Sequence, residues 1–388
     1  MTRRALALAV VLAVVLAACD PGAREAEPFT GIWESEGWGT FLLVEGGDVE
    51  IFEHTEVHCL SVASGGARGI ADVLSLDGER LVMRDNDRVV RFDPIELLPP
   101  RCADASGSPD PERAIAVLAA TVDEQMAPPP DPEWEERLAE ASLLAAGADD
   151  SVLLEAIGDL LDPLGGAVRV ATPDRDVAPP RPRFEPPDGT SPAADGAAAT
   201  GTMSAGVAYV GFDRIGPFDE DTEESERELT SLVDEAVRSS AVIIDLRAAD
   251  GGVLGHALLA ATRFVPTQTV VGRMEARAGD GFVPAGDLTV TPLPTGVYEG
   301  DAFVLVGPRT RGVAEVLALA LSTAPTVTLV GAPTAGTPGP PLIRFLPNGW
   351  TLSVPNLRVL DGAGAEVGFV EPDVVSDDPM ADALRMAG

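Results

Sequence analysis

The chain has 388 residues, of which 45% are hydrophobic, and this is enough material for two or three domains with buried cores. It carries 62 acidic against 27 basic residues, a formal net charge of −35, and none of the basic residues is a lysine. A surface this acidic repels phosphate backbones and anionic lipid head groups, so we expect no nucleic-acid partner.

Residues 1–19 have the features of a secretory signal peptide. Arg3 and Arg4 precede an apolar stretch, residues 5–16, and the segment ends in Leu-Ala-Ala-Cys, which resembles a bacterial lipobox. The resemblance implies cleavage before Cys19 and a lipid on its sulfur. No later stretch is long and apolar enough to span a membrane. We therefore expect an extracytoplasmic protein held on the bacterial membrane only by its N-terminal lipid.

Residues 20–28 form a short acidic tether, and residues 29–102 have the pattern of a small antiparallel β-domain. Short apolar stretches alternate there with glycine turns such as Gly46-Gly47 and Asp77-Gly78, which are hairpin signals. With Cys19 assigned to the leader, Cys59 and Cys102 remain as a pair. In an exported chain such a pair favours a disulfide over two buried free thiols.

Two histidines of this β-domain, His54 and His58, lie four residues apart in an expected strand or loop. A metal site needs more ligands at suitable spacing, so we interpret both as exposed side chains and expect no metal. Trp33 and Trp38 are interpreted as packing residues in the core or at its rim.

Residues 103–171 predict a helical connector, in which a linker rich in Ser, Pro and Asp leads into three helical patterns. Residues 172–202 are rich in Pro, Ala, Gly and Asp, and this composition predicts a mobile loop rather than a packed element. From residue 203 to 388 predicted strands alternate with helices, which indicates a mainly parallel sheet.

The stretch at residues 241–252 organises this α/β domain. Its β-branched run, residues 242–244, predicts a strand buried on both faces, and the pair Gly251-Gly252 then opens a helical segment. Such a turn exposes backbone N–H groups at the carboxyl end of a strand, where open α/β sheets bind ligands.

At this turn the sequence resembles the tail-specific (C-terminal-processing) serine peptidases, in particular their tricorn-like and retinol-binding-protein-like branch. Asp245-Leu246-Arg247 with Gly251-Gly252 is similar to the family's D-L-R-x-N-x-G-G turn, with Ala249 where asparagine is usual. Further similar motifs are GIWESEGWG at 31–39, PLGGAV at 163–168, GPRTRGVAE at 307–315, GAPTAG at 331–336, LPNGW at 346–350 and EPD at 371–373. The resemblance covers most of residues 30–378. It implies a ClpP/crotonase-like ββα superhelix with a peptide-binding cleft.

In this family a serine attacks the scissile carbonyl, a base accepts its proton, and backbone N–H groups hold the oxyanion. The resemblance places the oxyanion donors at Gly251, Gly252 and Val313. It places Gly312 where the serine stands and Ala167 where the histidine base stands, and the lysine that serves as base in the other branch is absent from the chain. Glu366 is the candidate orienting acid.

These substitutions lead to three hypotheses. The first is a pseudopeptidase that binds the C-terminal tail of a peptide or protein, with Arg311 pairing with the terminal carboxylate unless it is a solvated loop arginine. The second is an active serine-type peptidase in which His256 serves as base for Thr310 or for a serine such as Ser353. The third is a structural envelope lipoprotein that binds a partner protein through residues 29–102. None requires a cofactor, and residues 331–336 lack the lysine of a nucleotide loop.

Overall fold

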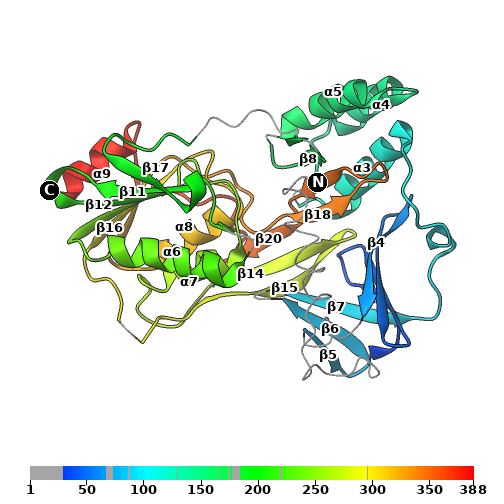
Figure 1. Cartoon of the computed structure of the whole chain (residues 1–388), viewed down its shortest axis with the longest axis horizontal. Coiled ribbons are helices and arrows are strands. Elements are labelled where there is room, and N and C mark those ends of the chain that lie inside the picture. Colours follow the sequence, from blue (N-terminus) through cyan, green and yellow to red (C-terminus); the bar gives the residue numbers. More distant parts are fainter. Residues whose placement is uncertain are drawn as a thin grey trace. The chain divides into compact units, whose positions relative to one another are not determined.

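The structure is a computed structural model that describes residues 29–66, 73–85, 88–127, 129–164, 166–173, 175–176, 184–218, 221–294 and 296–388. The predicted leader, the expected lipid-attachment residue Cys19 and the predicted tether lie outside the described residues. The chain forms two compact units (Figure 1). Among the described residues, the first unit contains those up to 181 with 276–285 and 341–356, and the second contains those of 182–275, 286–340 and 357–388.

The first unit contains a seven-stranded sheet in which all neighbouring strands are antiparallel, in the order β4-β3-β2-β1-β7-β6-β5. The strands are β1 (Gly31–Ser35), β2 (Thr40–Glu45), β3 (Asp48–His54), β4 (Cys59–Gly66), β5 (Leu74–Asp77), β6 (Arg80–Asp85) and β7 (Arg88–Ile95). Gly46 and Gly47, both at positive φ, connect β2 to β3 as the hairpin signal predicts. Cys59 and Cys102 form a disulfide that links β4 to the 3-10 helix η2 (Pro100–Cys102).

Three helices of the same unit, α3 (Pro111–Gln125), α4 (Trp134–Ala145) and α5 (Asp150–Leu161), follow the β-sheet in the chain. Asp110 and Asp149 cap α3 and α5, because each side chain accepts a backbone N–H from the first turn. The helices share a core with a small sheet in the order β18-β19-β8-β9. Its strands are β8 (Arg169–Thr172), β9 (Arg175–Asp176), β18 (Leu342–Phe345) and β19 (Thr351–Val354).

The expectation that His54 and His58 are exposed is wrong. His58 is only 2% exposed, and the side chain of His54 is 12% exposed. The ring of His54 stacks on Phe41, with 3.9 Å between the ring centroids. His54 at the end of β3 and His58 after the following turn are therefore largely buried. The spacing of the two histidines in the sequence could not show this. Trp33 and Trp38 are buried, as expected of packing residues.

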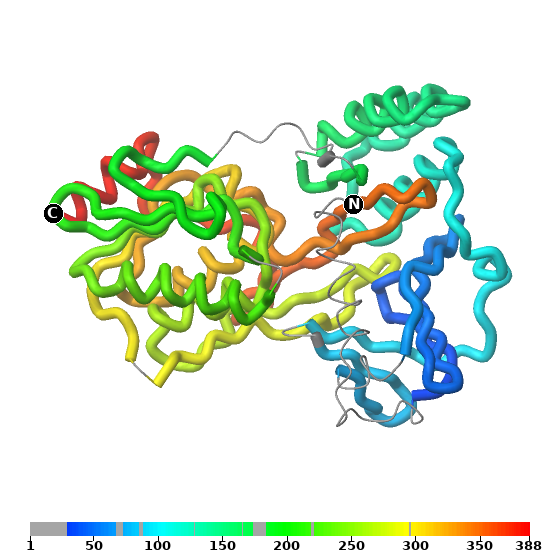
Figure 2. Tube along the Cα trace, viewed as in Figure 1, coloured from blue at the N-terminus to red at the C-terminus, as the bar shows by residue number. Residues whose placement is uncertain are grey.

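The second unit is built around a sheet in the order β10-β11-β12-β13-β16-β17-β21. The strands from β12 to β21 pair in parallel, and β10 and β11 add an antiparallel edge. Their bounds are β10 (Thr190–Ala193), β11 (Ala198–Thr202), β12 (Ala208–Phe212), β13 (Ala241–Asp245), β16 (Asp301–Val306), β17 (Val327–Gly331) and β21 (Val374–Val375). Figure 2 shows that this unit joins green, yellow and red stretches that are far apart in the sequence.

Helices cover both faces of this sheet. In Figure 1, α6 (Thr222–Ala236) and α7 (Leu254–Ala261) lie on one side and α9 (Pro379–Ala387) on the other. Ile243 and Phe303 point to the α9 face and pack with Ala383 of that helix. Helix α8 (Val313–Ser322) contacts α7, β16 and β17. All five residues of β13 are buried, as the apolar run predicts for a strand covered on both faces.

A separate three-stranded sheet has the order β15-β14-β20, with β14 (Thr269–Ala278), β15 (Gly281–Val290) and β20 (Leu357–Leu360). Together these elements confirm the predicted α/β class, with an antiparallel N-terminal sheet and a second sheet rich in parallel strands. No helix among the described residues is both long and apolar enough to cross a bilayer.

The prediction of a loop over residues 172–202 is wrong for its second half, because residues 190–193 form β10 and residues 198–202 form β11. Ala198 and Ala199 are fully buried, since their small side chains fit where β11 pairs with β12. A composition of Ala, Gly and Thr suits close packing at a sheet edge as well as it suits a flexible segment, so composition alone could not separate the two.

Candidate functional site

The site begins at the carboxyl end of β13, where Asp245 is fixed before the chain turns. Its carboxylate accepts hydrogen bonds from the Arg247 guanidinium at 2.9 and 2.7 Å and from the Tyr209 hydroxyl at 3.1 Å. Burial raises the pKa of Tyr209, and the Asp245 charge raises it further, so the hydroxyl remains a donor. This buried contact anchors the start of the glycine turn.

The glycine turn is held between two other segments by backbone hydrogen bonds. The Gly251 N–H donates to the Arg311 carbonyl at 3.1 Å, and the Arg311 N–H donates to the Ala249 carbonyl at 3.0 Å. On the other side, the Ile215 N–H donates to the Gly251 carbonyl at 3.2 Å. A Cβ on Gly252 would overlap the Ile215 carbonyl, so only glycine fits there.

The second half of the site is the sharp bend between β16 and α8. Gly312 has φ 63° and ψ −119°, a conformation that is strained for residues with a side chain. A Cβ at this position would lie 3.2 Å from the Gly339 carbonyl oxygen and 3.7 Å from the Gly251 Cα. The side-chain direction at position 312 therefore faces the glycine turn, but glycine places no reactive group there.

Glu315, which is fully buried, fixes the shape of this bend. Its carboxylate accepts from the Gly312 N–H at 2.9 Å, the Thr334 hydroxyl at 2.6 Å, the Gly336 N–H at 2.7 Å and the Thr337 N–H at 3.0 Å. Burial raises the pKa of Glu315, and these donors oppose that rise. The carboxylate thus joins the start of α8 to residues 334–337.

Two backbone N–H groups at this junction have no acceptor among the described residues, those of Gly252 and Val313. Val313 is the first residue of α8, so its N–H also lies at the positive end of the helix dipole. Gly251 was predicted to act as a third donor, but its N–H is already bound to Arg311. Two donors therefore remain for a carbonyl or carboxylate oxygen.

The other predicted residues have their own contacts within their units. Arg311 contributes through its backbone, and its side chain is half-buried. Glu366 forms an ion pair with Arg358 of β20 at 3.5 Å, and its side chain is 52% exposed. Ala167 belongs to the first unit, in a turn closed by its own N–H on the Leu164 carbonyl.

The proposed pairing of Thr310 with His256 is not formed. The Thr310 hydroxyl donates to the Leu246 carbonyl at 2.8 Å and accepts a hydrogen bond from the Gly307 N–H at 3.0 Å. Its proton is therefore already hydrogen-bonded and does not point to a base. His256 is buried rather than on a helix surface, and neither of its ring nitrogens has a partner in the described part of the chain. Burial lowers its pKa. Ser353 lies in β19 of the first unit.

The sequence reasoning missed Glu315 and Tyr209. Glu315 stands three residues after Gly312, the N-cap of α8, which is the spacing of a capping box, and this signal could have identified it. Nothing in the sequence links Tyr209 to Asp245, because only the parallel pairing of β12 with β13 brings them together.

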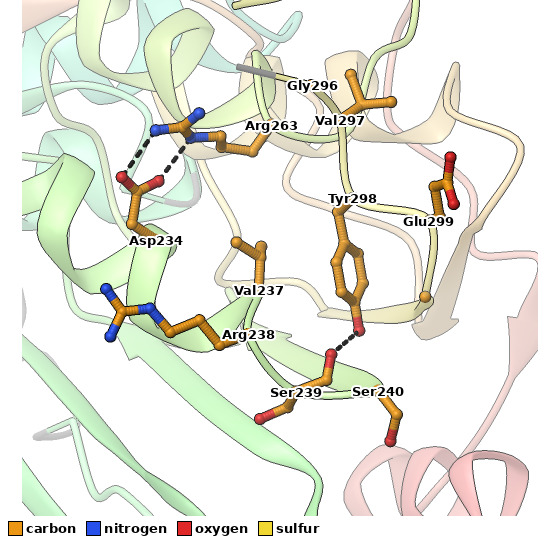
Figure 3. Close-up of a pocket in the computed structure, with 11 residues that line it drawn as sticks. Asp234, Val237, Arg238, Ser239, Ser240, Arg263, Gly296, Val297, Tyr298 and Glu299 are labelled. Carbon is orange, nitrogen blue, oxygen red and sulfur yellow. Dashed lines mark hydrogen bonds and ion pairs between the residues drawn. The ribbon is translucent and has the colours of Figure 1, made fainter.

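A pocket of about 610 Å³ opens elsewhere, at the amino ends of β13 and β16 (Figure 3). There Asp234 and Arg263 neutralise each other through contacts of 2.6 and 2.7 Å, and the Tyr298 hydroxyl donates to the Ser239 carbonyl at 3.0 Å. The glycine turn and the bend lie at the opposite, carboxyl ends of these strands. We therefore take the junction of Gly252 and Val313 as the candidate site.

Part of the chain matches a known protein family. Residues 206–376, which contain both the turn and the bend, match the model of peptidase family S41. This part of the chain is similar to family S41. The match confirms the predicted kinship with tail-specific serine peptidases. No curated protein matches the sequence.

Several solved structures are similar to this chain. A peptidase candidate from Parabacteroides merdae ATCC 43184 has a TM-score of 0.54 at 17% identity, with 72% of this chain and 93% of that chain covered. A lipoprotein from Streptococcus agalactiae has a TM-score of 0.48 at 14% identity, covering 76% and 98%. Mature CPAF has a TM-score of 0.46 at 11% identity, covering 71% and 95%.

Proposed function

We propose that this chain is an exported, lipid-anchored protein that binds peptide tails without hydrolysing them. The proposal of export and anchoring rests on the leader and on Cys19 in its lipobox-like sequence. The proposal of binding rests on one observation in the second unit: two N–H groups without a protein acceptor flank a bend that carries no side chain.

The binding step follows from the chemistry of these two donors. The N–H groups of Gly252 and Val313 suit an anionic oxygen, because hydrogen bonds to a charged acceptor are stronger than neutral ones. The dipole of the ten-residue helix α8 adds partial positive charge at Val313. A C-terminal carboxylate supplies such an oxygen, and Arg311, next to Gly312 in the chain, is the proposed second contact.

The loss of hydrolysis follows from the residues at the two catalytic positions. Gly312 has no hydroxyl and Ala167 has no proton acceptor, and the nearby Thr310 hydroxyl is buried and already donating. In a well-studied serine peptidase, losing the nucleophile alone lowers kcat about a million-fold. We therefore expect binding without measurable turnover.

The test is retention of the full chain, in non-ionic detergent, on immobilised peptides that differ only in a C-terminal carboxylate or carboxamide. Val313→Pro removes the backbone N–H at the first position of α8, where proline is otherwise tolerated, and Val313→Ala keeps it. We expect the wild type and Val313→Ala to prefer the carboxylate, and Val313→Pro to lose about tenfold or more in affinity. Circular dichroism checks that both variants fold. Equal retention of carboxylate and carboxamide by the wild type would contradict the proposal.

A further inference from the structure

Residues 213–217, which we call the clamp, hold the glycine turn from one side. Three backbone hydrogen bonds join the two segments: the Asp250 N–H donates to the Asp213 carbonyl at 2.9 Å, the Ile215 N–H to the Gly251 carbonyl at 3.2 Å and the Val253 N–H to the Ile215 carbonyl at 2.9 Å. Ile215 also pairs with Gly252 in a parallel β-bridge. The clamp therefore fixes the direction of the Gly252 N–H, which is one of the two donors of the candidate site.

His256, on the first turn of α7, packs directly against the clamp. A Cβ on Gly216 would overlap the His256 Nδ1, so the imidazole ring lies against the main chain of this glycine. Gly216 has φ 60°, which glycine adopts at little cost. His256 is only 1% exposed. The clamp thus rests on a buried imidazole that stands four residues after Gly252 in the chain.

The His256 ring has no group among the described residues that would stabilise a positive charge by a hydrogen bond. Neither Nδ1 nor Nε2 has a partner there. A neutral imidazole has one N–H donor and a protonated imidazole has two, so protonation would leave a second buried donor unsatisfied. Burial lowers the pKa of His256, and the charge of Glu226 on α6 opposes that shift. The ring is therefore neutral near pH 7 while the clamp is closed.

The elements packed around His256 bring few charges to the ring. Helix α7 contains no other residue that titrates. Helix α8, which contacts α7, has Glu315, whose carboxylate already accepts hydrogen bonds at the bend. On the clamp, Asp213 accepts from the turn through its carbonyl, and the Arg214 guanidinium donates to another clamp carbonyl at 3.1 Å. Because Glu226 makes no hydrogen bond to the ring, a protonated His256 could use this acid as a partner only after a rearrangement.

We propose that His256 is a positioning residue of the candidate site: its neutral ring supports the clamp on the glycine turn, and its protonation releases the clamp. A charged imidazole without an acceptor is costly to bury, and release of the clamp exposes it to water. The clamp lies outside the helices and strands, whereas α7 is almost entirely buried, so the clamp is the part that moves. The Gly252 N–H then loses its fixed direction. The effect on peptide tails rests on the proposed function.

The direction of the pH effect follows from the two states of the ring. When the clamp is released, His256 has an ordinary pKa of about 6.5, and when the clamp is closed its pKa is lower. The closed state therefore keeps its full stability above about pH 6.5 and loses stability as the pH falls below that value. Between pH 7.5 and 5.5, the ratio of closed to released clamp should fall by up to about tenfold. A peptide C-terminal carboxylate has a pKa of roughly 3.5, so the ligand stays ionised over this range.

Hydrogen–deuterium exchange of the full chain in non-ionic detergent measures the clamp without any ligand. The reporters are the amides of Asp250, Ile215 and Val253. After correction for the intrinsic pH dependence of exchange, we expect their protection to fall about threefold to tenfold between pH 7.5 and 5.5, while β13 stays protected. His256→Leu and His256→Gln have no titrating ring, so their protection should be the same at both pH values. His54→Phe removes a buried histidine of the first unit and is the matched control, which should keep the wild-type response.

The carboxylate and carboxamide peptides then test the link to binding. A ligand that binds only the closed clamp, at ten times its Kd, should raise the protection of the three reporter amides about tenfold, and the carboxamide should raise it less. Protection that does not change with pH, or that falls equally in His256→Leu and His256→Gln, overturns the release of the clamp. A carboxylate peptide that is retained but leaves the protection unchanged overturns the positioning role. Equal retention of both peptides at pH 7.5 overturns the proposed function instead, because the exchange measurement needs no peptide.

Discussion

Replacing Gly312 with serine returns a hydroxyl to the bend and tests whether its backbone is held in a strained conformation. The φ of 63° and ψ of −119° cost a residue with a side chain about 1–3 kcal/mol. The new Cβ would also lie 3.2 Å from the Gly339 carbonyl oxygen, so this neighbour must move by a few tenths of an ångström. We therefore expect Gly312→Ser to destabilise the second unit by about 1–3 kcal/mol, or by roughly 2–10 °C in its melting temperature.

The matched control is Gly307→Ser on the same connection, because a Cβ there meets nothing within 4 Å. We expect its effect to stay within about 0.5 kcal/mol. Differential scanning calorimetry of the full chain in detergent measures both variants, and a fluorogenic peptide measures hydrolysis. Neither variant should hydrolyse it, since Ala167 still offers no base. An unchanged melting temperature for Gly312→Ser refutes the strain argument, and turnover at an ordinary rate refutes the assignment of Ala167.

Three further predictions concern buried polar groups. Glu315→Ala leaves five donors without their acceptor, and we expect the free energy of unfolding in urea to fall by about 3–5 kcal/mol, together with loss of peptide binding. His256→Leu removes two buried ring nitrogens that have no partner among the described residues, so it should stabilise the second unit by about 1–3 kcal/mol in the same assay. A loss of stability would show that these nitrogens do have partners. The pKa of His54 is lowered to about 4 in the folded chain. As the pH falls below 6.5, His54 is therefore protonated in the unfolded chain before it is protonated in the folded chain, and this favours unfolding. Wild-type stability should therefore drop by up to about 3 kcal/mol between pH 6.5 and 4 relative to His54→Phe, and parallel pH profiles would refute this.

The sequence predicts the parts of this fold in which a local pattern has only one structural solution. The apolar run before Asp245 is too short for a helix, and it forms the central strand β13. The glycine pairs at 46–47 and 251–252 mark turns, because positive φ is accessible there at little cost. Asp149 begins a helix by accepting N–H groups that would otherwise have no partner.

The structural features that could not be predicted from the sequence depend on contacts between residues far apart in the chain. Gly251 loses its place as an oxyanion donor only because Arg311 accepts its N–H, sixty residues later. His58 is buried because α3 brings Arg113 against it, and a count of spacing between histidines carries no such information. The edge strands β10 and β11 cannot be predicted from the sequence, because their small residues have no strong strand propensity. They form strands because β11 pairs with β12.

The bend at Gly312 is shaped by its neighbours, because the Glu315 carboxylate and the Gly339 N–H hold its backbone on both sides. Under the proposed function, a bound chain end could approach the main chain here more closely than it could approach a residue that has a side chain. The terminal oxygens then have room to sit where a hydroxyl would otherwise project. In the proposed peptide-tail site, glycine at position 312 would thereby leave a larger space for a product-like carboxylate.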